Sequence, residues 1–181
     1  MRTFSILFQI SVVIAMANAF PLAAGHVMKD TVVGPYTIEL HIVPAEPFFT
    51  AEEVTAKHAT EGMLIMGGAT PVAPDAKERP NRHLVVHVYD AKTGKAVTGA
   101  KVTMKFQNLD EKGTLSGGSI NVPVVIMQAI GKGVESTHYG NNVSMPSGTY
   151  LVTVSVNNKK ADFKVAVSDS STVPMEKMHM H

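Results

Sequence analysis

The sequence predicts a single domain with an antiparallel β-sandwich fold. Short segments in which apolar and polar residues alternate recur along the chain, as expected for strands that bury one face. Turn signals, for example at residues 92–95 and 116–119, separate these segments. Five to seven short strands with such punctuation are typical of a sandwich, and residues 20–173 have the length of one domain without an internal repeat.

Residues 1–19 have the pattern of a signal peptide. Arg2 supplies a positive charge, an apolar run follows at residues 6–16, and Ala17-Asn18-Ala19 provides the small residues that a signal peptidase recognises. We therefore expect cleavage before Phe20 and export to the periplasm. The apolar run is shorter than a typical membrane-spanning helix, so a retained N-terminal anchor is the less favoured alternative.

The alternating pattern identifies the predicted strands. It is clearest at residues 36–42, 84–88, 102–106, 150–156 and 163–167. Within the first of these segments the apolar residues alternate with Thr37, Glu39 and His41, so these three side chains are expected on the polar face.

The stretch between the first two of these strands has mixed signals. One or two helical turns are predicted at residues 51–58, because Thr50 and Glu53 have the spacing of a capping box. Residues 61–68 predict a short strand that ends in glycines, and residues 67–80 predict a long exposed loop.

Charge and composition exclude several classes of partner and site. Loss of Arg2 with the signal peptide leaves 16 − 1 = 15 basic residues against 15 acidic ones, a net charge of zero. Nucleic acids and anionic membranes select basic surfaces, so neither is expected as a partner. The chain has no cysteine, which excludes thiolate zinc sites, iron–sulfur clusters and blue-copper centres. A metal site would have to use His, Met, Asp, Glu or the backbone.

Three histidines are candidate metal ligands on strand faces. If the apolar residues of 84–88 face the core, His83 and His87 lie on the opposite face. The two are roughly 13 Å apart along a strand that rises about 3.3 Å per residue, so a single ion is expected to bind only one of them. His41 could approach from a paired strand. The alternative is that each is an ordinary exposed histidine on a polar face.

Residues 138–145 bring together two kinds of ligand. His138 and Met145 lie in a segment with glycine and two asparagines, which predicts a binding loop ahead of the next strand. Imidazole and thioether donors together suit copper better than magnesium or calcium. Met66 is a second thioether candidate, whereas the sequence leaves open whether Met127 packs in the core.

The C-terminal segment, residues 174–181, is predicted to be a flexible tail that binds metal. Its candidate ligands are Met175, Met178, His179, Met180 and His181. Flexible His/Met tracts capture metal ions; thioethers favour Cu(I), and imidazole also accepts Cu(II). The alternative is an unstructured end whose composition is accidental.

Two segments indicate the type of sandwich. Residues 88–102 resemble bacterial immunoglobulin-like domains, in which a strand, a Thr-Gly turn and an Ala-x-Val strand recur. Residues 146–152, Pro-Ser-Gly-Thr-Tyr-Leu-Val, resemble the penultimate strand of those domains. The resemblance implies an immunoglobulin-like fold and nothing about function, because such sandwiches have many functions.

The segment His138-Tyr139-Gly140-Asn141-Asn142-Val143-Ser144-Met145 resembles the His-Tyr-Gly-x-Asn-x-x-Met motif of the periplasmic iron-transport accessory family. Those proteins are immunoglobulin-like, have a copper-binding His/Met site and work beside an iron permease. The resemblance implies that His138 binds the metal. The family's histidine-bearing strand corresponds to residues 61–66, which contain no histidine, and His83 and His87 occupy the next strand instead. The chain therefore resembles a divergent member.

The sequence thus predicts a periplasmic protein that binds copper, with iron as an alternative cargo, and assists metal uptake or homeostasis. The expected ligands are His138, His83 or His87, and His41, with Met66 or Met145 as thioether donor. The expected partners are the metal ion and an inner-membrane iron or copper transporter, and a homodimer is compatible with the sequence. No nucleophile–base arrangement is present, so enzyme activity is not expected. The rival interpretation is an immunoglobulin-like interaction or adhesion module without a functional metal site.

Overall fold

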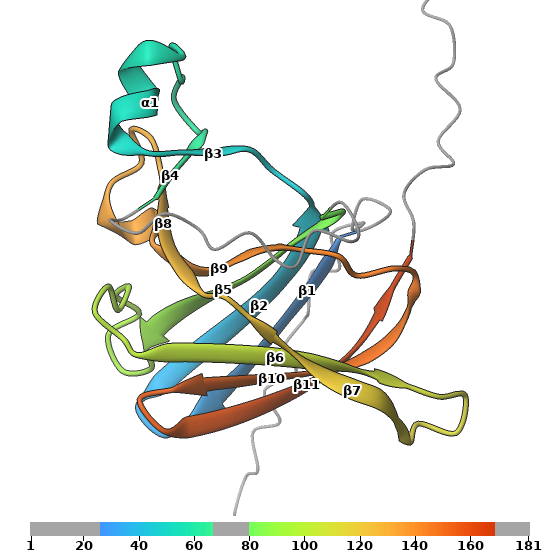
Figure 1. Cartoon of the computed structure of the whole chain (residues 1–181). Helices are drawn as coiled ribbons and strands as arrows, with labels where there is room; N and C mark the ends of the chain where they lie inside the picture. Colours follow the sequence, from blue (N-terminus) through green and yellow to red (C-terminus); the bar gives the residue numbers. More distant parts are fainter. Residues whose placement is uncertain (1–25, 67–79, 169–181) are drawn as a thin grey trace, which may run out of the picture.

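The computed structural model describes residues 26–66 and 80–168, and these form an immunoglobulin-like β-sandwich, as predicted. Two sheets pack face to face (Figure 1). Within these residues no helix is both long and apolar enough to cross a membrane. The predicted signal peptide, most of the predicted loop at 67–80 and the predicted tail at 174–181 lie outside the described residues.

The larger sheet has seven strands and carries the candidate site. Their order across the sheet is β1 (Val27–Val33), β2 (Tyr36–Pro44), β5 (Arg82–Asp90), β9 (His138–Val143), β8 (Val125–Ala129), β4 (Leu64–Met66) and β3 (Phe48–Phe49). Neighbours are antiparallel except β3 and β4, which are parallel. Strand β5 is therefore hydrogen-bonded to β2 on one side and to β9 on the other.

The smaller sheet has four antiparallel strands in the order β11 (Lys159–Val167), β10 (Gly148–Val156), β6 (Val102–Leu109) and β7 (Leu115–Val122). All five segments with clear alternation are strands, so that part of the prediction is confirmed. Residues 116–119, which predicted a turn, lie inside β7 instead. This strand lies at the sheet edge and is exposed up to Asn121, so its glycines meet no packing requirement there.

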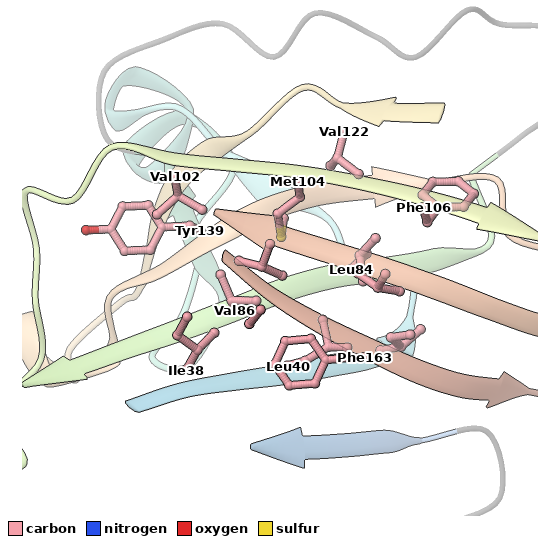
Figure 2. Close-up of a cluster of buried hydrophobic side chains, with 14 of the residues drawn as sticks. Ile38, Leu40, Leu84, Val86, Val102, Met104, Phe106, Val122, Tyr139 and Phe163 are labelled. Atoms are coloured by element: carbon pink, nitrogen blue, oxygen red, sulfur yellow. The ribbon is translucent and has the colours of Figure 1, made fainter. Parts of the chain in front are cut away.

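The main core lies between the two sheets and is formed by the apolar face of each alternating strand. Leu40 of β2 and Leu84 and Val86 of β5 face Met104 of β6 and Phe163 of β11 (Figure 2). All five side chains are buried, and each such burial contributes about 1.5–3 kcal/mol to folding. Because β2 and β5 place their even-numbered residues in this core, their odd-numbered residues are on the outer face of the larger sheet.

Strand β9 corrects the prediction of a loop at residues 138–145. Residues 138–143 are a strand in the middle of the larger sheet, paired with β5 and β8. Glycine and asparagine are depleted in strands, but tertiary contacts compensate here. The amide of Asn141 donates to Pro123 O at 2.7 Å, and its Oδ1 accepts from Asn142 N at 2.8 Å. Gly140 allows β9 to approach β5 more closely than a side chain would permit.

A short arm between β2 and β5 extends from one end of the sandwich (Figure 1). It contains β3, α1 (Ala51–Ala56) and β4, and joins the rest of the sheet through the pairing of β4 with β8. The predicted capping box is confirmed, because Thr50 Oγ1 accepts from Glu53 N at 3.1 Å and Glu53 Oε2 accepts from Thr50 N at 3.0 Å. The helix has no buried residue, so its own packing contributes little to the core.

Candidate histidine site

Four histidines gather on the outer face of the larger sheet. His41 comes from β2, His83 and His87 come from β5, and His138 is the first residue of β9. The strand alternation that sends the even-numbered residues of β2 and β5 into the core sends His41, His83 and His87 to the opposite face. On β9 it is Tyr139 that enters the core, so its neighbour His138 is on the outer face. The sheet order then brings β2 and β9 to either side of β5.

The rings form a continuous chain of neighbours. Ring centroids are 4.9 Å apart for His41 and His87, 5.2 Å for His87 and His138, and 5.8 Å for His138 and His83. His138 thus bridges the gap between the two histidines of β5. All four candidate histidines are brought together by the structure.

An open pocket of about 230 Å³ lies above these rings. Its wall consists of all four histidines together with Val43, Glu46, Val85, Ala129 and Ser136. Val85 lies between His83 and His87 on β5, and its partner on β9 is Gly140, which has no side chain. Gly140 therefore places no side chain beside Val85 on this face of the sheet.

Hydrogen bonds fix the proton on two of the rings. His83 Nδ1 lies 2.9 Å from Asn142 Oδ1, and His138 Nδ1 lies 2.9 Å from Ser136 O. Both oxygens can only accept, so each Nδ1 carries the hydrogen and each Nε2 keeps its lone pair. Among the described residues His83 Nε2 has no hydrogen-bond partner although it is buried.

The other two rings also have an unused nitrogen. His87 makes a backbone hydrogen bond with Thr137, while its Nδ1 is buried without a hydrogen-bond partner in the described part of the chain. His41 Nε2 lies 3.7 Å from Glu39 Oε2, a distance that allows charge attraction but is too long for a hydrogen bond. A buried polar atom without a hydrogen bond costs about 1–3 kcal/mol, and three of the histidines that line this pocket each have one.

Burial keeps the rings neutral. Desolvation lowers the pKa of His83 to about 4 against a smaller opposing effect of the Asn142 hydrogen bond. It also lowers the pKa of His87 to about 4, helped by the repulsion that arises when His87 and His138 are both protonated. Burial also lowers the pKa values of His138 and His41, and for His41 it outweighs the attraction of the Glu39 carboxylate. At neutral pH the four imidazoles are therefore in the form that binds metal ions.

The four rings lie as neighbouring pairs and do not surround one point. Within residues 26–66 and 80–168, no three His, Asp or Glu side chains stand in positions ready to hold one ion. Two imidazoles that bind one ion at about 2 Å have ring centroids roughly 5 Å apart, and the three neighbouring pairs match this separation. Binding by three or four rings would require their side chains to rotate toward a common centre.

The predicted methionine ligands are placed differently. Met145 is fully buried in the core between the sheets, and its backbone is held by Asn81 on both sides. It is therefore not brought to His138. The backbone of Met66 pairs with Met127, and Met127 pairs in turn with His138. The predicted tail ligands, Met175 to His181, lie outside the described residues.

Met127 is the residue at this site that the sequence left unassigned. It is fully buried beside the site, in a small cluster with Val85 and Val125 beneath the arm, and it pairs directly with His138. The alternation of buried residues along β8 places Val125 and Met127 on one face, but only the sheet order shows that this face is the one with the histidines.

Comparison of the chain with protein-family models, with curated proteins and with solved structures gave no match. The resemblance of residues 138–145 to the iron-transport accessory family therefore stays a prediction. The chemistry of the pocket itself is therefore what can indicate a function.

Proposed function

We propose that this protein binds copper in the histidine pocket and assists the uptake or homeostasis of copper or iron. The observation that carries the proposal is that His41, His83 and His87 line one pocket and that each has a buried imidazole nitrogen without a hydrogen-bond partner among the described residues. A metal ion would pair with each of these nitrogens that keeps a lone pair and offset the cost of burying it.

The donor chemistry favours copper over other divalent ions. Imidazole suits copper, zinc, iron and nickel, and among first-row divalent ions Cu²⁺ binds most tightly to a given set of such ligands. Among the described residues Glu46 is the only carboxylate in the pocket wall, so this wall offers hard ions such as Mg²⁺ and Ca²⁺ few of the oxygen ligands that they require. Iron is the second cargo, because imidazole and carboxylate donors together also accept it.

The pocket suits capture and transfer of an ion better than catalysis. It is open to solvent, and its rings already lie in neighbouring pairs that could pass an ion from one to the next. We propose that the protein acts in the periplasm and delivers the ion to an inner-membrane transporter. Within this proposal the ion is cargo, and no bond of a substrate is made or broken.

Copper titration of the protein from Phe20 onward tests the proposal. His87→Ala and His138→Ala should each lower the affinity for Cu(II) by at least about 100-fold, more than the 10–100-fold typical of a residue that only supports a ligand. His26→Ala is the matched control, because His26 is exposed and lies outside the pocket wall. Unchanged affinity in both pocket variants would refute the proposal.

The tail needs a separate arm of the same experiment. A chain that ends at Val173 lacks all five candidate tail ligands but keeps the complete pocket. We expect it to retain the tightest copper site and to lose only additional weaker binding. If removal of the tail abolished all copper binding, the pocket would not be the site.

A further inference from the structure

Asn142 links the histidine pocket to the arm. Its side chain faces His83 across the β5–β9 pair, and its Oδ1 lies 2.9 Å from His83 Nδ1. The same Oδ1 accepts from Glu46 N at 3.3 Å, while Nδ2 donates to Glu46 O at 2.7 Å. One amide group therefore holds both a pocket histidine and the backbone of a residue that lines the pocket.

We propose that Asn142 is a positioning residue that sets the tautomer of His83 and fixes the chain at Glu46 as one wall of the site. The inference rests on the proposed function, because its value lies in preparing His83 to bind metal. It assigns no ligand role to Asn142 itself.

The chemistry follows from the amide group. With Nδ2 committed to Glu46 O, Oδ1 must be the atom that faces His83, so the ring has to donate through Nδ1. The lone pair is then on Nε2, which is buried and has no hydrogen-bond partner among the described residues. Without this bond the ring would be free to carry its hydrogen on Nε2, the nitrogen that would bind the ion.

The contact with Glu46 adds a steric effect. The chain from Glu46 leads to Phe48, whose ring lies 6.3 Å from the ring of His83 at an angle of 42°. Phe48 is thus an aromatic neighbour that restricts the space in which the ring of His83 can rotate. A hydrogen bond on one edge and an aromatic neighbour on another hold the ring in one orientation, which lowers the entropic cost of binding.

The first test measures the tautomer of His83 in the metal-free protein by ¹⁵N NMR. Wild type should show the hydrogen on Nδ1. Asn142→Leu, similar in size but without an acceptor, should give a mixture or the Nε2–H form, whereas Asn142→Asp should keep the Nδ1–H form because a carboxylate still accepts. An unchanged tautomer of His83 in Asn142→Leu would overturn the proposal. An Nε2–H form in Asn142→Asp would also overturn it, and this second variant decides the case if Asn142→Leu does not fold.

The second test measures Cu(II) affinity and the copper EPR spectrum. Asn142→Leu should weaken binding by about 10–100-fold and change the spectrum, as is usual for the loss of a group that orients a ligand. Asn108→Leu is the matched control, since Asn108 is exposed on the other sheet. If Asn142→Leu leaves the Cu(II) affinity and the spectrum unchanged while His83→Ala abolishes binding, the role of Asn142 is refuted and the proposed function is not. Absence of copper binding in wild type would refute the proposed function, and the tautomer measurement would still decide the role of Asn142.

Discussion

Replacement of Gly140 by alanine should destabilise the protein and distort the histidine pocket. A Cβ at this position would lie 2.7 Å from both Cα and Cγ1 of Val85, and still closer to the carbonyl oxygen of Leu84. Two of these atoms belong to the backbone of β5, so no side-chain rotation can relieve the contact. Strand β9 would have to move away from β5 instead.

The structure sets the size of the effect. Ordinary van der Waals contact begins at 3.4 Å, so the distance to Val85 Cα must grow by 3.4 − 2.7 = 0.7 Å, and the distance to the carbonyl oxygen of Leu84 must grow by more. Overpacking of this kind costs about 1–3 kcal/mol, and each ladder hydrogen bond that the shift weakens adds up to about 1 kcal/mol. We expect a loss of about 3 kcal/mol, a large share of the roughly 5–15 kcal/mol that stabilises a typical domain.

Urea unfolding followed by circular dichroism measures this loss. Gly118→Ala is the matched control, because Gly118 is also in a strand but a Cβ there would meet nothing within 4 Å. The control should stay within about 0.5 kcal/mol of wild type. Copper affinity should also fall in Gly140→Ala, since His138 would move with β9 away from His87. A Gly140→Ala protein as stable as the control would refute the reasoning about close strand approach.

Three further predictions concern acidity, the core and the arm. Burial lowers the pKa values of His83 and His87 from 6.5 to about 4. As the pH falls, the unfolded state therefore binds protons before the folded state does, and the folded protein loses stability. The contribution of the two neutral rings to stability is complete above about pH 6.5 and is lost as the pH falls through 4. The urea midpoint should therefore fall between pH 7.5 and pH 4.5, and by less in His83→Asn; an equal fall in both proteins would contradict this. Met145→Leu should cost less than about 1.5 kcal/mol and leave copper affinity unchanged, because Met145 is buried in the main core; a tenfold loss of affinity would show that its sulfur binds the ion after all. Thr50→Ala should destabilise the helix of the arm by about 1 kcal/mol. Amide hydrogen exchange should become faster at residues 51–56 without a comparable change in β10. Equally faster exchange in both segments would show that the arm and the sandwich open together.

The sequence predicted the fold and the faces of the strands well. Alternation along residues 36–42 and 84–88 identifies the core side, and the opposite placement of His41, His83 and His87 follows from it. The capping box is also predictable from the sequence, because it depends only on Thr50 and on Glu53 three positions later. These features depend on residues close together in the chain.

Features that depend on strand order could not be predicted. The spacing of roughly 13 Å between His83 and His87 predicts that a single ion binds only one of them. The sequence does not show that the ring of His138, on a neighbouring strand, lies close to both. Met145 lies near His138 in sequence, yet it is packed in the core. The composition of residues 138–145 favoured a loop, and only the partners of Asn141 and the close approach at Gly140 explain a strand there.

Strand β5 has one consequence for how such a protein can change in evolution. Leu84, Val86 and Val88 belong to the core, while His83, Val85 and His87 line the pocket, and the two sets alternate residue by residue. A substitution in the second set alters the ligands with little disturbance of the packing between the sheets. One short strand therefore separates the demands of folding from those of binding, so ligand preference can drift while the sandwich persists.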